Sequence, residues 1–306
     1  MSPETQGSPE VSVVIASVES KHSIAACLQS VEASLAGIEA EVFVVDASRD
    51  KSADIAEQNL GRGRVIRCAP GTLTPELWAI GIARTTGRIV ALTTGHFVMD
   101  PTWISSLMRG LREGTAGVGG RIDLAARATP MDWAVFYLRY SEFLSEPVGA
   151  VTVRGIAADN AAYDGESVRR FVRARPDGFW EVEHHGDLHA AGLALAMVPG
   201  ATGRFTRSFP FHTILSHRFH HGRHAGAWRA SRGDRSAAAI VFAAPLVPLL
   251  LGLRVWGRVR ALAAHRTRFL RSLPAFLVLA ASWAAGEAVG ALAGAPSPRQ
   301  PAAAPA

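Results

Sequence analysis

The segment IVALTTGHFVMDPTW, residues 89–103, carries the strongest indication of fold in this chain. Its first four residues are apolar without alternation, which predicts a strand buried on both faces. A short polar loop, Thr93–His96, follows, and the chain then turns at Pro101 into a helix opened by Trp103. A buried strand that ends in polar side chains and leads into a helix is typical of an α/β sheet with a ligand site at its strand ends.

Similar strand patterns precede this segment. Apolar runs at Val11–Ser17 and Glu41–Asp46, and a short one at Arg64–Arg67, alternate with helical patterns. The alternation predicts parallel strands wound with helices. Ligands of such sheets bind at the carboxyl ends of the strands. Three polar clusters stand at these ends: Ser17–Glu19, Asp46–Asp50 and Thr93–His96.

The pattern changes after Gly120. Met131–Leu144 predicts an aromatic-rich helix, Val151–Ile156 an antiparallel strand, and Phe179–Leu195 a helix that carries several acids. Asp159–Tyr163 is expected to lead into a further helix. The first 230 or so residues therefore predict an α/β domain with a mixed sheet flanked by helices.

Positive charge is concentrated near the C-terminus. The chain has 306 residues, a formal net charge of +6 and a pI of about 10.1. Arginines gather between residues 254 and 271 with no acid among them. Such a cluster indicates phosphate groups, and its strongly apolar flanks favour lipid headgroups. A nucleic-acid partner is not expected, because only Trp256 and Phe269 interleave these arginines.

Two apolar segments flank the arginines. Ser236–Leu253 and Leu273–Gly294 are each near the ~20 residues that span a bilayer; the alternative is a pair of buried core helices. Two full spans would place the arginine loop across the membrane from the preceding domain, against the positive-inside rule. We therefore expect a re-entrant or interfacial hydrophobic hairpin on the cytoplasmic face of the membrane, with Pro245 and Pro248 breaking its first segment.

These patterns predict four regions. Residues 1–10 form a polar, disordered lead-in that is not a signal peptide. Residues 11–232 form the α/β domain, and residues 236–294 form the membrane-associated helices with their arginine-rich connector. Residues 295–306 form a disordered tail. Cys27 and Cys68, the two cysteines, have no metal-site spacing.

The motifs that are missing exclude several nucleotide sites. Val11–Ser17 is not followed by GxGxxG, and the chain has no GxxxxGK[ST] and no GxSxG. Instead, Asp46, Ser48, Asp50 and Ser52 alternate after the second strand. Carboxylates at a strand end accept hydrogen bonds from a nucleobase or a ribose; the alternative for Asp50 is capping of the next helix.

The order and spacing of these motifs resemble glycosyltransferase family 2, the inverting enzymes with the Rossmann-like GT-A (nucleotide-diphospho-sugar transferase) fold. The resemblance extends over residues 11–230. It is carried by VSVVIAS from Val11, VVDASRDKS from Val44, DPTW from Asp100, DNAAY from Asp159, and Glu181.

The resemblance implies roles for the polar residues. Asp46 and Asp50 would contact the base and ribose of a nucleotide-sugar donor, near Ser17 and Glu19. Glu181 would deprotonate the acceptor hydroxyl. On the acceptor side the resemblance places Asp159, Asn160 and Trp180.

Within the family, the chain is similar to a membrane-linked subgroup with a Thr-acid-Asp-His loop in place of Asp-x-Asp. Thr93 and His96 match that loop, and the Gly286-Glu287 step matches its hydrophobic tail. Thr94 and Gly95 stand where the subgroup has acids. The loop therefore offers a divalent metal no carboxylate, although Mg²⁺ and Mn²⁺ prefer oxygen ligands.

Two arrangements at the diphosphate remain open. In one, His96 and the diphosphate itself hold Mg²⁺ or Mn²⁺ beside Thr94. In the other, transfer is metal-independent, and Arg218 and Arg223 of the segment HRFHHGR neutralise the diphosphate.

The sequence thus predicts an inverting glycosyltransferase at the cytoplasmic membrane face. Its donor would be a nucleotide sugar, with a UDP-sugar favoured, and its acceptor a lipid or a lipid-linked envelope polysaccharide. The alternative is a catalytically inactive relative that binds a nucleotide sugar or a partner enzyme at the membrane. The missing acids at Thr94 and Gly95 motivate this second hypothesis.

Overall fold

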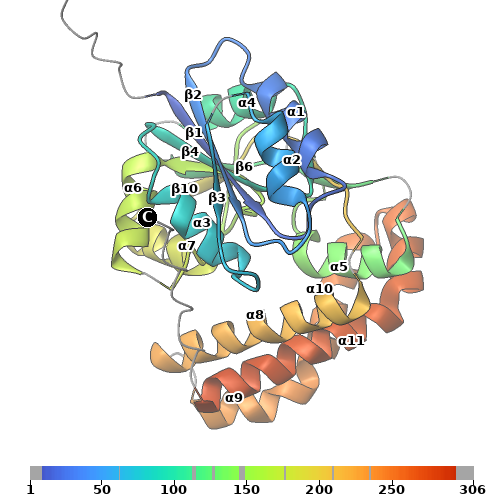
Figure 1. The fold of residues 1–306 in the computed structure, drawn as a ribbon. Helices are drawn as coiled ribbons and strands as arrows, with labels where there is room; N and C mark the ends of the chain where they lie inside the picture. Colours follow the sequence, from blue (N-terminus) through green and yellow to red (C-terminus); the bar gives the residue numbers. More distant parts are fainter. Residues whose placement is uncertain are drawn as a thin grey trace, which may run out of the picture. The chain divides into compact units, whose positions relative to one another are not determined.

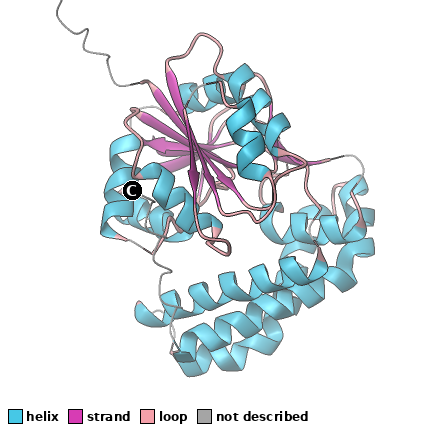
Figure 2. Ribbon diagram, in the orientation of Figure 1, coloured by secondary structure: helices cyan, strands magenta, loops and turns pink. Residues whose placement is uncertain are grey.

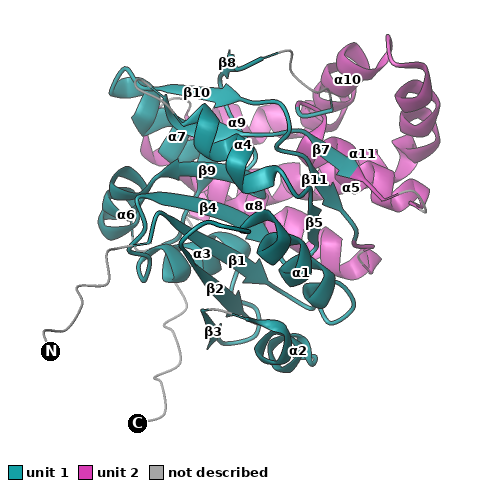
Figure 3. Cartoon of the chain, turned by 90° about the horizontal axis from the view of Figure 1, so that it is seen from above, with its two compact units in different colours: residues 1–123, 143–206, 299–306 teal, residues 124–142, 207–298 magenta. Residues whose placement is uncertain are grey.

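The computed structural model describes residues 9–61, 63–111, 115–125, 128–144, 149–175, 177–208, 210–233 and 236–293. The chain divides into two compact units (Figure 3). The first holds residues 1–123, 143–206 and 299–306, and the second holds residues 124–142 and 207–298. Most of the predicted lead-in and the whole predicted tail lie outside the described residues, and the domain limits at 232 and 236 stay a prediction.

A mixed sheet forms the centre of the first unit (Figure 2). Its strands in chain order are β1 (Val11–Ser17), β2 (Ala40–Asp46), β3 (Arg64–Arg67), β4 (Ile89–Thr94), β6 (Thr115–Gly119), β8 (Val151–Val153), β9 (Asn160–Asp164) and β10 (Ala194–Met197). Within the described residues the order across the sheet is β3-β2-β1-β4-β9-β6-β10-β8. The first four strands in this order run parallel, and β9 runs antiparallel to both β4 and β6. The predicted mixed sheet is confirmed.

Helices flank this sheet (Figure 1). They are α1 (Ile24–Ser34), α2 (Ser52–Asn59), α3 (Thr74–Ile82), α4 (Trp103–Gly110), α6 (Gly165–Ala174) and α7 (Glu181–Ala190). All residues of β1 and β4 are buried, as their unbroken apolar runs predict. α3 packs directly on β1 and β2, because Gly81 has no side chain to hold it away from Val14 and Val45.

A smaller three-stranded sheet has the order β5-β11-β7, and its first strand, β5, directly follows β4 in the chain. Its strands are β5 (Phe97–Met99), β7 (Ile122–Leu124) and β11 (Gly203–Phe205). Phe97 and Phe205 pack with their ring centroids 5.5 Å apart. The polar loop between β4 and β5 is therefore only Gly95 and His96, and both strands that border it are anchored by pairing.

One expectation in the second half of this unit is confirmed and one is wrong. The segment Asp159–Tyr163 leads into helix α6, as predicted, and Asn160–Asp164 is itself the buried strand β9, because it pairs with a neighbour on each side. The expected helix to Leu195 ends at Ala190, since Gly192 adopts a positive φ of 75° and stops it. Strand β10 consequently begins at Ala194.

The second unit is mainly helical in its described residues. It consists of α5 (Pro130–Tyr140), α8 (Phe211–Ser231), α9 (Ala237–Ala243), the 3₁₀ turn η1 (Ala244–Leu246), α10 (Val247–Val259) and α11 (Ala263–Ala293). Pro245 and Pro248 occupy first-turn positions of η1 and α10, where a missing N–H removes no helical hydrogen bond. The expected break at these prolines is thus a single 3₁₀ turn.

Glycines bring α8 and α11 into close contact. Gly222 and Gly226 of α8 face backbone carbonyls of α11, and Gly286 and Gly290 of α11 face backbone carbonyls of α8. A Cβ at any of the four would collide with a main-chain oxygen of the other helix. Two small-xxx-small motifs thus form one crossing, the arrangement that lets apolar helices approach closely.

Two helical segments are long and apolar enough to cross a membrane. They are Ala237–Val259 and Ala263–Ala293. The most apolar stretch of the first is only 11% buried, whereas that of the second is 39% buried. Phe242, Leu249 and Leu253 project into solvent from the first segment.

Candidate active site

Polar residues at the ends of β1 and β2 form one hydrogen-bonded cluster. Asp46 is 3% exposed, and its two carboxylate oxygens accept from the backbone N–H of Ser48 at 2.9 Å and from the Ser48 hydroxyl at 2.8 Å. Ser48 Oγ also accepts from the backbone N–H of Glu19 at 2.7 Å. The structure therefore brings Glu19 and Asp46 together, as a nucleoside site at these strand ends requires.

Asp50 and Glu19 hold the two loops that leave these strands. Asp50 accepts from the backbone N–H of Ser52 at 2.9 Å, at the first residue of α2, and from that of Lys21 at 3.4 Å. Glu19 adopts a left-handed φ of 50°, and its carboxylate accepts from the backbone N–H of Arg49 at 2.8 Å. Asp50 thus accepts from the first N–H of α2, although the N-cap residue of this helix is Lys51. Its nucleoside role stays a prediction.

Two hydroxyls at these strand ends are buried without a hydrogen-bond partner among the described residues. Ser17 is fully buried and lies in register with Asp46, and Thr93 is fully buried on β4. Buried polar groups are nearly always hydrogen-bonded, so an unsatisfied pair is notable. The donor contact expected of Ser17 stays a prediction.

His96 is held inside the chain. Its ring is 6% exposed, with Nε2 3.0 Å from the carbonyl oxygen of Val18 and Nδ1 3.2 Å from Ser23 Oγ. The hydroxyl of Ser20 also lies 3.3 Å from Nε2. Both ring nitrogens are engaged, so metal binding by His96 would require these contacts to be broken.

Gly95 has no space for the acid that the subgroup's loop carries. A Cβ there would lie 2.8 Å from Ser20 Oγ and 3.1 Å from the end of the Ile24 side chain. The backbone N–H of Gly95 donates to the carbonyl of Ala16 at 2.9 Å, which fixes the loop on β1. The absence of a side chain at Gly95 therefore lets the loop pack closely against Ser20 and the start of α1.

A carboxylate approaches the loop from the neighbouring strand. Thr93 of β4 pairs with Asn160 of the antiparallel strand β9. Thr94 and Asp159 are the next residues beyond this pair, so they also lie opposite each other. The Thr94 hydroxyl lies 3.5 Å from Asp159 Oδ1, and Asp159 is 4% exposed. Sequence reasoning placed Asp159 on the acceptor side; the structure places it beside Thr94, where the loop itself has lost its acid.

Glu181 is the first residue of α7 and adjoins the same turn. Its Oε2 accepts from the backbone N–H of Ala158 at 2.7 Å, so consecutive residues contact Glu181 and Thr94. The pKa of buried Tyr163 is raised well above its usual range, first by burial and then by the charges of Glu181 and Asp159. Glu181 and Asp159 therefore lie within electrostatic reach of one phenol.

Two other predicted acceptor-side residues have contacts within the chain. Asn160 is fully buried; its Oδ1 accepts from the Trp103 indole at 2.7 Å, and its Nδ2 donates to the carbonyls of Arg121 and Ala201, both at 2.8 Å. This amide joins three segments of the framework. Trp180 directly precedes α7, and its indole donates to the carbonyl of Asp177 at 3.2 Å.

The helix of Glu181 contains a buried ion pair that sequence reasoning missed. Glu183 is 4% exposed and lies 2.7 Å from Arg175, which also lies 2.9 Å from Asp187. The spacing of Glu183 and Asp187, four residues apart on one helix, was the available signal for a shared cation.

Two histidines of α7 are buried beside Tyr163. The Tyr163 hydroxyl lies 3.0 Å from His185 Nε2, and His184 packs among aromatic rings. Burial lowers the pKa of His184 to about 4 and, with help from the charge of His184, that of His185 to about 3. Both are neutral at neutral pH and belong to the support of the Glu181 helix.

The predicted diphosphate arginines belong to the second unit. Arg218 and Arg223 lie on α8, and the pKa of Arg218 is lowered to about 10 by burial and by Arg139. Burial and the same arginine lower the pKa of His217 to about 4. This part of α8 is rich in positive charge and would gain from an anion, and the diphosphate role of Arg218 and Arg223 stays a prediction.

Comparisons with known proteins agree with this architecture. The mannosyltransferase PcManGT from Pyrobaculum calidifontis, solved in complex with GDP-Man and Mn²⁺, is similar over 92% of this chain and 88% of its own, with a TM-score of 0.55 and 14% identity. S. aureus TarS 1–349, solved in complex with UDP-GlcNAc, is similar over 68% of this chain and 65% of its own, with a TM-score of 0.50 and 11% identity. At these identities the likeness shows the GT-A fold. No curated protein matches the chain in sequence.

A sequence-family model decides the relationship. The model described as glycosyl transferase family 2 matches residues 12–171, just over half of the chain. The match includes β1, β2, the β4 loop and the turn with Asp159. This chain belongs to glycosyl transferase family 2.

Proposed function

We propose that this family 2 glycosyltransferase moves a sugar from a nucleotide donor to an acceptor hydroxyl with inversion, using Glu181 as the base. The observation that carries the proposal is the turn Ala158-Asp159: its backbone N–H orients the Glu181 carboxylate, and its acid lies beside Thr94 at the end of β4. The nucleoside would lie against the cluster of Ser17, Glu19, Asp46 and Asp50.

The transfer step is a single displacement. The acceptor oxygen bonds to the anomeric carbon while its proton passes to Glu181. The bond from that carbon to the diphosphate breaks, and the nucleoside diphosphate leaves with the electron pair. Inversion follows because the acceptor attacks the face opposite the leaving group.

A divalent ion fits this site only when the substrate completes it. The described residues hold no cluster of three His, Cys, Asp or Glu side chains that could bind a metal. Asp159 and Thr94 do offer a carboxylate and a hydroxyl side by side, and oxygen ligands suit Mg²⁺ and Mn²⁺. Asp159 and Thr94 would hold the ion together with the donor's diphosphate, and the ion would offset the charge of the departing group.

The helices of the second unit support action at a membrane. Ala237–Val259 has a mean hydropathy of 2.1 over its most apolar window, only 11% of which is buried, unlike the core helix of a soluble protein. The arginines between residues 254 and 271 would contact headgroups on the cytoplasmic side. A lipid or lipid-linked acceptor at that surface is the substrate we propose.

Donor binding and turnover test the proposal separately. Calorimetry of the full chain with UDP, with and without Mn²⁺, should show binding that Mn²⁺ strengthens, and Asp159→Asn should remove the Mn²⁺ effect. Membranes containing the protein should transfer labelled sugar from a UDP-sugar. If UDP binds but no donor is turned over, the inactive relative is favoured instead, the hypothesis motivated by the missing acids at Thr94 and Gly95.

A further inference from the structure

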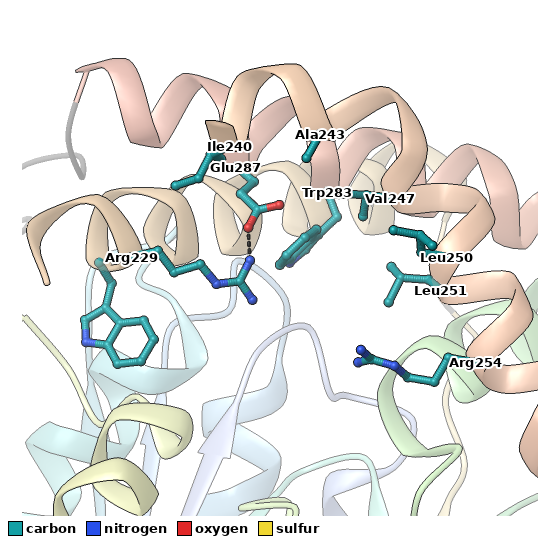
Figure 4. Close-up of a pocket in the computed structure, with 10 residues that line it drawn as sticks. Arg229, Ile240, Ala243, Val247, Leu250, Leu251, Arg254, Trp283 and Glu287 are labelled. Carbon is teal, nitrogen blue, oxygen red and sulfur yellow. Dashed lines mark hydrogen bonds and ion pairs between the residues drawn. The ribbon is translucent and has the colours of Figure 1, made fainter. Parts of the chain in front are cut away.

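A cavity within the helical unit lies apart from the candidate active site. It has a volume of about 390 Å³ and lies among α8, α9, α10 and α11 (Figure 4). One wall is aliphatic, and its residues are Ile240, Ala243, Val247, Leu250 and Leu251. The opposite side, from α8 and α11, is charged and aromatic, with Trp228, Arg229, Trp283 and Glu287. Arg254 follows the aliphatic residues on α10 (Figure 4).

The charges of this cavity do not balance. Glu287 is 3% exposed and forms an ion pair with Arg229, whose guanidinium also lies 5.6 Å from the centroid of the Trp283 ring. Arg254 has no hydrogen bond or ion pair with any described residue, and its guanidinium extends into the space beside Trp283 (Figure 4). Two arginines against one glutamate leave one positive charge, and an anion would compensate it.

The surroundings of the cavity are those of an amphiphile site. The aliphatic wall belongs to the segment Ala237–Val259, and neighbouring side chains on that segment are exposed: Phe242 is 83% exposed and Leu253 58%. Leu250 lines the cavity and is itself 58% exposed, so the apolar wall continues onto the outer surface. A ligand here would meet a cation at one end and a continuous apolar surface at the other.

We propose that this cavity binds the phosphate headgroup of an anionic glycerophospholipid, with Arg254 as its ligand and the α9–α10 wall along its acyl chain. A guanidinium matches phosphate oxygens in charge and geometry. The Arg229–Glu287 pair keeps the cavity polar at its base, and the glycine crossing of α8 and α11 holds that pair in place. The proposal rests on the membrane association proposed above and not on sugar transfer.

Lipid binding by the purified full chain in non-ionic detergent tests this. Phosphatidylglycerol and phosphatidylcholine of equal chain length are titrated, and bound lipid is counted by native mass spectrometry. Arg254→Gln should lower phosphatidylglycerol affinity about tenfold, the effect of losing about one charge-assisted hydrogen bond. Arg170→Gln, an equal loss of charge at a 71% exposed side chain on α6, outside the cavity and the arginine cluster, should change nothing. Inorganic phosphate should not displace the lipid at equal concentration, because the acyl chain contributes to binding.

Three outcomes would overturn the proposal: equal affinity for the two lipids, equal effects of Arg254→Gln and Arg170→Gln, or displacement by inorganic phosphate. The melting temperature of each variant is measured alongside, and unchanged values show that the helical unit is intact. Recovery of the protein in the membrane fraction is a separate readout. Its absence would contradict membrane association itself, whatever the state of glycosyl transfer.

Discussion

Replacing Glu181 with glutamine is the most direct test of the site. The new side chain keeps an oxygen that can accept from the Ala158 N–H, now 2.7 Å from Oε2, so the turn and helix α7 should hold their positions. The proton acceptor, however, is lost. Because a positioned general base contributes roughly 10²–10⁴-fold, about 3–5 kcal/mol of barrier lowering should disappear. Donor affinity should stay at the parent value.

Two neighbouring acids make matched controls. Glu166→Gln alters a side chain that is 76% exposed and pairs with Arg170 on α6, and should leave both turnover and stability unchanged. Glu183→Gln weakens the pair with Arg175, in which the Glu183 side chain is only 6% exposed. It should lower the free energy of unfolding by roughly 1–3 kcal/mol, as loss of a buried charge-assisted hydrogen bond does.

The assay measures labelled sugar transferred from a UDP-sugar by membranes, normalised to folded protein. Calorimetric UDP affinity and the melting temperature accompany it. The expected pattern is a rate loss confined to Glu181→Gln and a stability loss confined to Glu183→Gln. Turnover of Glu181→Gln equal to that of Glu166→Gln would refute the base assignment, and so would a rate loss that merely follows the melting temperature.

Three further predictions concern other parts of the chain. In α8, Gly226→Ala should lower the melting temperature in detergent, because its Cβ would meet a backbone oxygen of α11, whereas Gly257→Ala, with open space around it, should preserve or raise it. Burial lowers the pKa of His184 to about 4, so between about pH 6.5 and pH 4 the unfolded chain binds a proton that the folded chain does not. The free energy of unfolding should therefore fall by on the order of 3 kcal/mol as the pH is lowered through this range. Urea unfolding at pH 7 and pH 5 should therefore show His184→Phe losing less stability than the parent. Restoring an acid by Gly95→Asp should reduce the melting temperature without strengthening Mn²⁺ binding in calorimetry, because Ser20 occupies the space.

Much of the first unit follows from local pattern. Val11–Ser17 and Arg64–Arg67 are strands with the bounds that their apolar runs predict. Buried parallel strands have continuous apolar sequences, so a single run is sufficient evidence. β9 escaped prediction because Asn160–Asp164 is short and rich in alanine, and its strand state depends on pairing with β4 and β6.

Some residues of the candidate site could be predicted from the sequence, whereas their contacts could not. Motif order indicated Glu19, Asp46 and Glu181, because these residues sit at strand ends or at a helix start. Sequence position could not reveal that Asp159 stands beside Thr94, since 65 residues separate them and only the pairing of β4 with β9 joins them. Likewise, the burial of Glu183 depends on a cation, Arg175, whose approach is set by tertiary packing.

For this protein, the sequence alone determined the family, the positions of the parallel strands in the first half of the chain and the loss of both acids from the loop at Thr94–Gly95. Each of these is a local property of residue type and spacing. The tertiary structure decided what the loop has in their place: the two nitrogens of His96 turned inward, Ser20 packed against Gly95, and Asp159 brought to Thr94. These contacts form between segments far apart in the chain, so only the folded arrangement of the strands and helices specifies them.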